Sequence, residues 1–220
     1  MKAIFINGSP RKSNNTAEIL QSAMKGAQSA GAETELVHLY DLQFKGCMSC
    51  FACKLKNAKT NGVCAIKDEL RPVLEKCKEA DIIVIGTPIY YSSVTGLTRC
   101  FMERLLFPVG SYELDEDGRI KKYHKKVIPT AMIYTMNVSE QNLDNYHYRE
   151  LLSANSMPMR MLFGHCEELY VCDTYQFKDY SRYAANLFNE EAKAKHRDEH
   201  FPIDLQNAFD LGKRLVEMVK

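Results

Sequence analysis

The chain has 220 residues, of which 26% are charged, and its formal net charge is +1. A balance this close to neutral gives no electrostatic reason to expect a nucleic acid or an anionic membrane surface as a partner. No apolar run in the sequence approaches the ~20 residues of a membrane-spanning helix, and the first residues lack the basic and apolar regions of a signal peptide, so we expect a cytoplasmic protein. Its eight cysteines are then expected to be mostly thiols, metal ligands or redox groups rather than structural disulfides.

Short apolar runs bounded by turn residues predict five buried β-strands. They are expected over residues 2–7, 33–39, 81–88, 126–134 and 166–172. Apolar residues at helical spacing predict helices between and after these runs. The helices are expected over residues 15–30, 68–79, 95–106, 146–163 and 204–220. This alternation predicts a single α/β domain over 1–220, with a doubly wound five-stranded parallel sheet flanked by helices.

Three segments fall outside the alternation and are expected as surface insertions, at about 43–65, 107–125 and 173–203. The first holds a cluster of cysteines. The second contains Asp117-Gly118, which is typical of a hairpin turn. The third is polar and aromatic without a strong period. Either of the last two could cover a site or contribute to a contact between subunits.

The polar loop after the first strand predicts an anion site. The strand breaks at Gly8 and a helix restarts behind small hydroxyl and amide residues, so backbone N–H groups point into one small volume. An asparagine at 14 or 15 tolerates the left-handed conformation that such loops often need. The candidate phosphate ligands are Ser9, Arg11, Ser13, Asn14, Asn15 and Thr16. One dominant charge suits a monophosphate, and an ordinary N-capped turn is the alternative.

The loop after the 81–88 strand is the second candidate ligand site, because that strand is expected to lie beside the first one. Pro88 is expected to end the strand, and Tyr90 can present its ring to a flat ligand. The candidate contacts are Pro88, Ile89, Tyr90, Ser92 and Ser93. A phosphate loop beside an aromatic, serine-bearing loop describes the two ends of a mononucleotide. The alternative is that the two tyrosines at 90 and 91 are ordinary surface aromatics.

A third loop, Tyr134 to Asn137, is expected to approach the same ligand from the other side, with Thr135 and Met136 as candidate contacts. This expectation depends only on its position after a neighbouring strand. Three histidines lack the partner spacing of a catalytic dyad and are expected at the surface or with satisfied hydrogen bonds. They are His124, His147 and His165.

The first insertion carries a cluster of four cysteines, the number that an iron-sulfur cubane or a structural zinc needs. They are Cys47, Cys50, Cys53 and Cys64. Three cysteines at every third residue favour iron-sulfur over zinc, and free or redox-active thiols remain open. If the segment is helical, Cys50 and Cys53 share one face and could simply pack against the sheet. The other four are expected as small buried hydrophobes: Cys77, Cys100, Cys166 and Cys172.

These motifs, in this order, resemble the flavodoxin-like NAD(P)H-dependent FMN reductases, including the iron-sulfur flavoproteins. The resemblance covers about the first 140 residues and joins Gly8-Ser9-Pro10-Arg11, the cysteine cluster up to Asp68, and Ala80-Asp81 leading to Thr87-Pro88-Ile89-Tyr90. It implies that Ser9, Arg11, Asn15 and Thr16 bind the FMN phosphate, and that Pro88, Ile89, Tyr90 and Ser93 flank the isoalloxazine. Asn14 stands where the family usually has glycine. The fourth cysteine of the iron-sulfur members lies closer to the third than the ten intervening residues found here.

The resemblance implies an FMN-dependent oxidoreductase that takes hydride from NAD(P)H and reduces a small acceptor such as a quinone or a flavin. An iron-sulfur flavoprotein that carries single electrons between proteins, with a [4Fe-4S] cluster on the four cysteines, is the first alternative. A non-catalytic binding or sensor module with zinc on those cysteines is the second. A homodimer or homotetramer is expected from the family, and no nucleic acid or membrane partner is expected.

Overall fold

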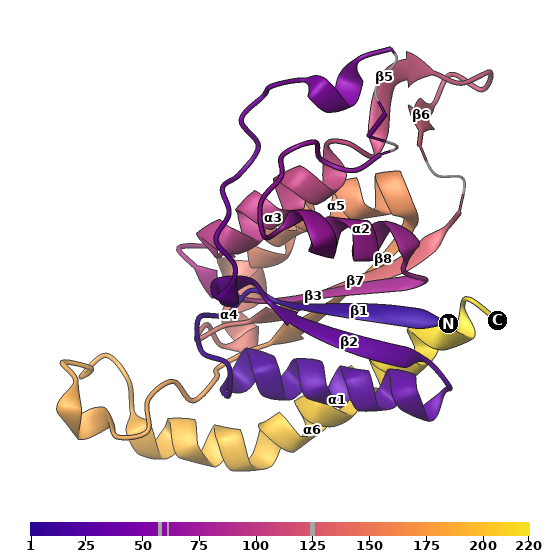
Figure 1. Cartoon of the computed structure of the whole chain (residues 1–220). Coiled ribbons are helices and arrows are strands. Elements are labelled where there is room, and N and C mark those ends of the chain that lie inside the picture. Colours follow the sequence, from indigo (N-terminus) through magenta and orange to yellow (C-terminus); the bar gives the residue numbers. More distant parts are fainter. Residues whose placement is uncertain (57–58, 61, 124–125) are drawn as a thin grey trace.

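Five parallel strands form the central sheet of the molecule, in the order β2-β1-β3-β7-β8 (Figure 1). The computed structural model describes residues 1–56, 59–60, 62–123 and 126–220. The strands are β1 (Lys2–Asn7), β2 (Glu33–His38), β3 (Ile82–Tyr90), β7 (Ile128–Thr135) and β8 (Gly164–Val171). Their order and parallel directions confirm the predicted flavodoxin-like, doubly wound sheet.

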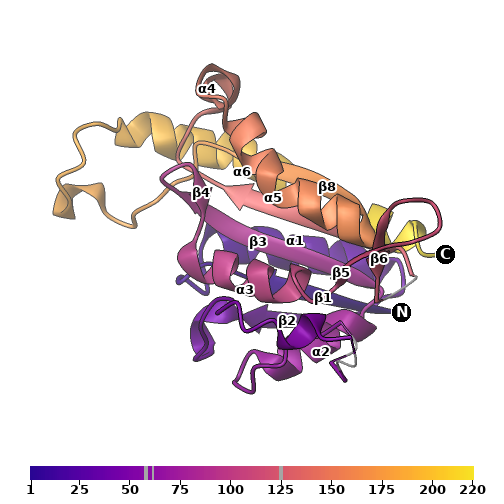
Figure 2. The same cartoon turned by 90° about the horizontal axis from the view of Figure 1, so that it is seen from above.

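Helices cover both faces of the sheet (Figures 1 and 2). One face carries α1 (Asn15–Ser29) and α6 (Glu190–Glu217). The other carries α2 (Arg71–Glu79), α3 (Gly96–Leu106) and α5 (Tyr148–Phe163). Smaller elements are α4 (Glu140–Asn145), β4 (Ser93–Val94) and the single 3-10 turns Leu39–Asp41, Ala52–Lys54 and Tyr180–Arg182. Within the described ranges, none of the helices is both long and apolar enough to cross a membrane.

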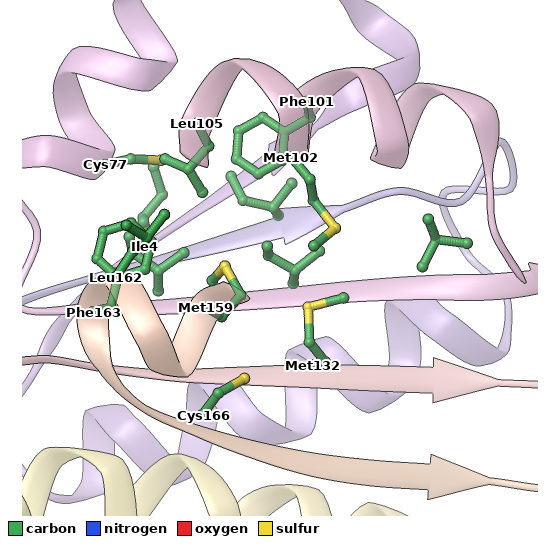
Figure 3. Close-up of a cluster of buried hydrophobic side chains, with 14 of the residues drawn as sticks. Ile4, Cys77, Phe101, Met102, Leu105, Met132, Met159, Leu162, Phe163 and Cys166 are labelled. Carbon is green, nitrogen blue, oxygen red and sulfur yellow. The ribbon is translucent and has the colours of Figure 1, made fainter. Parts of the chain in front are cut away.

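A hydrophobic core fills each side of the sheet. On the side of α3 and α5, Phe101 and Met102 of α3 meet Met159 of α5 above the strands (Figure 3). Each large apolar side chain buried in this way contributes about 1.5–3 kcal/mol. The position of α3 on the sheet is therefore fixed by its core face, and so are the positions of its two ends.

The structure corrects two helix boundaries. The helix expected over 204–220 begins at Glu190, inside the segment expected as a polar insertion. Asn189 starts it, because its side chain accepts a hydrogen bond from the Ala192 N–H at 2.9 Å. The helix expected over 146–163 is preceded by a separate helix, α4, and begins at Tyr148, because His147 adopts a left-handed conformation.

The structure also corrects the end of one strand. β3 continues through Pro88 to Tyr90, where it pairs with the short antiparallel strand β4. Proline is compatible with an extended chain, and the β4 pairing keeps the chain extended beyond it. In the second insertion, the expected hairpin is confirmed as β5 (Gly110–Leu114) and β6 (Ile120–Lys122).

Candidate functional site

The loop between β1 and α1 is tied to the neighbouring strand and helix through Gly8. Its N–H donates to the Gly86 carbonyl at 2.8 Å, and its carbonyl accepts a hydrogen bond from the Thr95 hydroxyl at 2.8 Å. A Cβ at this position would lie 1.9 Å from Oγ1 of Thr98. Only glycine therefore fits, because the loop passes so close to the first turn of α3.

Side chains of the loop itself complete its conformation. Asn7 Oδ1 accepts from the Ser9 N–H at 2.9 Å, and Ser9 Oγ accepts from the Arg11 N–H at 3.1 Å. Asn14 is the N-cap of α1 and has a φ of −123°. The expectation of a left-handed residue at 14 or 15 is therefore wrong, since neither has a positive φ. Asn14 caps the helix by accepting a hydrogen bond from Asn15 N–H, which places the positive end of α1 at the loop.

The structure brings the three predicted loops together around one pocket at the carboxyl end of the sheet. Thr16 of the first loop and Thr135 of the third are joined by a hydrogen bond of 2.7 Å between their hydroxyls. Ten of the predicted residues line the pocket: Ser9, Arg11, Asn14, Asn15, Thr16, Pro88, Ile89, Tyr90, Thr135 and Met136. Hydroxyl, amide and guanidinium groups thus line the same pocket as the Tyr90 ring, which is the combination expected of a mononucleotide site.

Three predicted residues are not part of the pocket lining. Ser13 is exposed. Ser92 donates to the Tyr148 hydroxyl at 3.3 Å, and Ser93 pairs with Tyr90 in the β3–β4 hairpin. Both serines belong to the turn beside the pocket, in which the chain reverses direction from β3 into β4.

That turn is strained. Tyr91 and Ser92 have φ values of 47° and 64°, and neither is a glycine or an asparagine. A two-residue hairpin of this kind needs positive φ at both central positions, which costs of order 1–3 kcal/mol for each side chain. Tyr91 is fully exposed and Tyr90 is 45% exposed. The β3–β4 pairing thus holds two non-glycine residues in a conformation that they rarely adopt.

The segment after β8 lies over the first loop and adds residues that the sequence analysis missed. Arg11 Nη1 donates to the Gln176 carbonyl at 2.8 Å, and Asn15 Nδ2 donates to the Tyr175 carbonyl at 2.9 Å. Thr174 and Gln176 join Asn137 in lining the pocket. The only signal available was topological, because the chain that leaves β8 starts at the same edge of the sheet as the other loops.

Arg197 of α6 is a further missed residue. It bonds Oδ1 of Asn15 through Nη1, and it bonds Glu18 through Nη2 at 2.7 Å. Asn15 is 4% exposed, so both ends of its side-chain amide are fixed by partners from the carboxyl-terminal third of the chain. Arg197 therefore orients the first turn of α1 toward the pocket.

We call residues 43–65 the cysteine loop, and its described part from Cys47 to Lys54 packs against the carboxyl-terminal end of α3. The Cys47 N–H donates to Glu103 Oε2 at 3.2 Å, and the ring of Phe51 meets the ring of Phe107 edge-on at 6.0 Å. Lys54 donates to the carbonyls of Phe107 and Gly110. The loop is thus attached to the carboxyl-terminal end of α3 and to the residues that follow it.

The four predicted ligands differ in exposure. Cys53 and Cys64 are buried, Cys47 is half-buried and Cys50 is exposed. Burial raises the pKa of the Cys53 thiol, against the opposing effect of the Lys54 charge. The set of four thiols has the chemistry of an iron-sulfur or zinc site. Within the described residues, however, no three cysteine, histidine or carboxylate side chains are gathered closely enough to hold a metal, so metal binding would require the thiols to move closer together.

The remaining cysteines and histidines take no part in the pocket. Cys77 and Cys166 are buried as predicted, whereas Cys100 and Cys172 are only partly buried. His147 is exposed. His165 is partly exposed, with Nε2 3.7 Å from a Glu167 oxygen. The expectation for His124 lies outside the described residues.

The sheet order and the pocket at the carboxyl ends of its strands define a flavodoxin-like protein. The family model described as NADPH-dependent FMN reductase matches residues 1–163. The chain therefore belongs to the NADPH-dependent FMN reductase family.

Curated relatives are iron-sulfur flavoproteins. One from Archaeoglobus fulgidus is 41% identical over 115 residues, covering 52% of this chain and 54% of the relative. Another, from Methanosarcina thermophila, is 30% identical over 104 residues, covering 47% of this chain and 52% of the relative. The chain thus spans about half the length of the curated relatives it matches.

Solved structures share the fold over nearly the whole chain. An NAD(P)H:quinone oxidoreductase from Methanothermobacter marburgensis has a TM-score of 0.67 at 16% identity and covers 98% of this chain and 96% of its own. An azoreductase from Bacillus anthracis has a TM-score of 0.65 at 13% identity, with 97% and 99% covered. At these identities the likeness shows the fold alone.

Proposed function

We propose that the protein is an FMN-dependent oxidoreductase that takes hydride from NAD(P)H and reduces a small acceptor such as a quinone or a flavin. The observation that carries this proposal is the pocket in which three loops of the sheet converge. Bound FMN would supply the redox chemistry, as a hydride acceptor and an electron donor. The protein's part is to bind and orient it.

The residues divide between two ends of the pocket. Ser9 and Thr16 would hold the phosphate, because they are buried at the positive end of α1. Asn15, whose amide is held by Tyr175 and Arg197, would fix the first turn of that helix. Pro88 to Tyr90 and Thr135 to Asn137 would contact the ring, since they line the pocket from the ends of β3 and β7. The half-exposed ring of Tyr90 leaves one side open, where a nicotinamide and an acceptor would bind in turn.

The test is FMN binding followed by turnover. The absorption spectrum of the purified protein should show oxidised flavin, and NADPH oxidation should accelerate when a quinone is added. Thr16→Val should weaken FMN binding, because it removes a buried hydroxyl at the predicted phosphate end. Ser13→Val, at an exposed position outside the pocket lining, is the matched control. A colourless protein that takes up no FMN would refute the proposal.

An iron-sulfur flavoprotein is the second candidate. It is favoured by the four thiols of the cysteine loop, which contacts Glu103 of α3, while the N-cap of the same helix contacts Gly8 of the first loop. It is also favoured by the names of the relatives. Iron and acid-labile sulfide in anaerobically purified protein would support it. Zinc without iron would instead favour a structural or sensory role for the loop.

Self-association into a dimer or tetramer is also proposed. The β5–β6 hairpin exposes apolar side chains, with Tyr112 at 73% and Leu114 at 68% exposure. Patches of this kind are typical of contact surfaces. Light scattering on the eluting protein should give a mass above that of one chain, and Leu114→Lys should reduce it.

A further inference from the structure

Arg104 of α3 is buried completely, with a side chain that is 0% exposed. Arginine rarely occupies such a position unless its charge is paired. Here the partner is Asp68, which accepts two hydrogen bonds, one from Nη1 and one from Nη2, the latter at 2.9 Å. This bidentate geometry satisfies the charge and uses two of the five guanidinium donors.

The other terminal donors of Arg104 bind two backbone carbonyls. Nη1 donates to Lys45 O at 3.1 Å, and Nη2 donates to Ile66 O at 3.3 Å. Lys45 is two residues before Cys47, and Ile66 is two residues after Cys64. One side chain therefore joins the two ends of the segment that carries all four cysteines of the loop.

The fifth donor of the guanidinium is unused. Nε of Arg104 is buried, and it has no hydrogen-bond partner among the described residues. The Cys64 side chain is close enough to the guanidinium to interact with it. The carbonyl of Cys64 is bound in turn by Arg71. A buried, unpaired N–H beside a buried thiol is a donor available to a sulfur ligand.

A purely structural ion pair would not need this arrangement. A buried pair contributes little more to stability than two apolar side chains of similar volume. What apolar side chains cannot replace is the planar fork that reaches two carbonyls and a carboxylate at once. The contacts to Lys45 and Ile66 are therefore the specific contribution of arginine at this position.

We infer that Arg104 is the positioning residue of the cysteine loop. By binding the carbonyls of Lys45 and Ile66, it joins the two ends of the loop and holds Cys47 and Cys64 near α3. This inference rests on the proposed iron-sulfur function for the identity of the ligand, and it does not depend on FMN. Arg104 would thus order the metal site without being a ligand itself.

The test uses the full-length, reduced and FMN-loaded protein freed of metal. Zn²⁺ alone serves as the probe of the four-thiol site, and its affinity is measured by isothermal titration. In the variant R104M/D68N no buried charge is left unpaired, so the fold should be kept. Arg214→Met, which removes an exposed arginine and its ion pair with Glu167 on the other side of the sheet, is the matched control.

We expect R104M/D68N to bind zinc about 10–100-fold more weakly, as do other variants in the surroundings of metal ligands. FMN affinity and the melting temperature should stay close to those of the wild type. Arg104→Lys should also lose affinity, because one ammonium cannot reach both carbonyls. Zinc affinity equal to that of the wild type in the folded double variant, or in Arg104→Lys, would overturn the inference.

A second readout needs no metal. Alkylation of Cys64 relative to Cys50, measured by peptide mass spectrometry, reports whether the loop is closed, because Cys64 is buried and Cys50 is exposed. The ratio should be low in the wild type and in Arg214→Met, and should rise toward 1 in R104M/D68N. An unchanged ratio would contradict the inference even if the wild type bound no zinc. Failure of FMN to bind would refute the proposed flavin function and leave this readout unaffected.

Discussion

The two candidate redox regions of this molecule are built in different ways. The pocket loop is tied to the sheet through the backbone of Gly8, which binds Gly86 and Thr95, and Arg197 adds a contact to Asn15. The cysteine loop is held by long side chains, from Arg104 and Glu103 on α3 and from Lys54 in the loop itself. A site of the first kind forms with the sheet. A site of the second kind depends on a few side chains and on its ligand.

The largest effect that separates the regions is expected from removing thiols. Cys50→Ser with Cys53→Ser should abolish metal binding, because two of four ligands are lost, and should leave FMN affinity unchanged. Metal analysis and flavin titration of the same preparation measure both. Cys172→Ser, outside the loop, is the control and should keep its metal. A parallel loss of FMN in the double variant would show that the two regions are not independent.

Gly8→Ala should have the opposite effect, weakening FMN binding and leaving metal binding unchanged. The new Cβ would meet Thr98 Oγ1 at 1.9 Å, so the loop must shift, at a cost of about 1–3 kcal/mol, and FMN binding should weaken. Gly96→Ala is the matched control, since its new methyl group would have no contact within 4 Å among the described residues beyond its chain neighbours and the backbone of its own helix. Adding Thr98→Ala should restore part of the loss. Normal FMN affinity in Gly8→Ala would mean that the tight approach does not matter for the pocket.

Arg11→Met should weaken FMN binding by about 1.5–3 kcal/mol, if the guanidinium forms a charge-assisted bond with the phosphate. Lys12→Met is the control, because Lys12 is an exposed neighbour that pairs with Asp41. Fluorescence titration of FMN compares the two. Unchanged affinity in Arg11→Met would limit the role of Arg11 to its bond with Gln176.

Acid should weaken the ion pair between Arg104 and Asp68 at the base of the cysteine loop. The hydrogen bonds of Arg104 hold the pKa of Asp68 below its usual 3.8. A lowered carboxyl pKa adds stability that is present above 3.8 and is lost as the pH falls through the folded value. The free energy of unfolding in urea should therefore fall more steeply between pH 5 and pH 3, as rough limits of that window, in the wild type than in R104M/D68N. Equal slopes would contradict the assigned role of the pair.

The sequence predicted the pocket better than it predicted what surrounds it. A strand, a glycine and a capped helix are local signals, so Ser9, Asn15 and Thr16 could be found from spacing. The contacts of Gln176 and Arg197 join residues 165 and 182 positions apart, and no local pattern predicts such pairs. Arg104 carried one usable signal, because it lies on the same face of α3 as Phe101 and Leu105, which point into the core.

The Pro88 expectation failed for a similar reason. Whether a proline ends a strand depends on what pairs with the chain beyond it, and here that partner is β4. The positions of the four thiols relative to one another were equally out of reach, because the spacing of cysteines in the sequence does not give their positions in space. In both cases the conformation depends on a contact with another segment of the chain, β4 for Pro88 and α3 for the cysteine loop.

Helix α3 also has an electrical polarity. Its eleven residues span about 16 Å, with the positive end of the helix dipole beside Gly8 and the negative end beside the cysteine loop. Negative charge is thus stabilised at the pocket end and opposed at the thiol end. The ammonium of Lys54, on the carbonyl of Phe107, offsets the negative end. The electrostatic difference between the two regions accordingly depends on the Lys54 side chain.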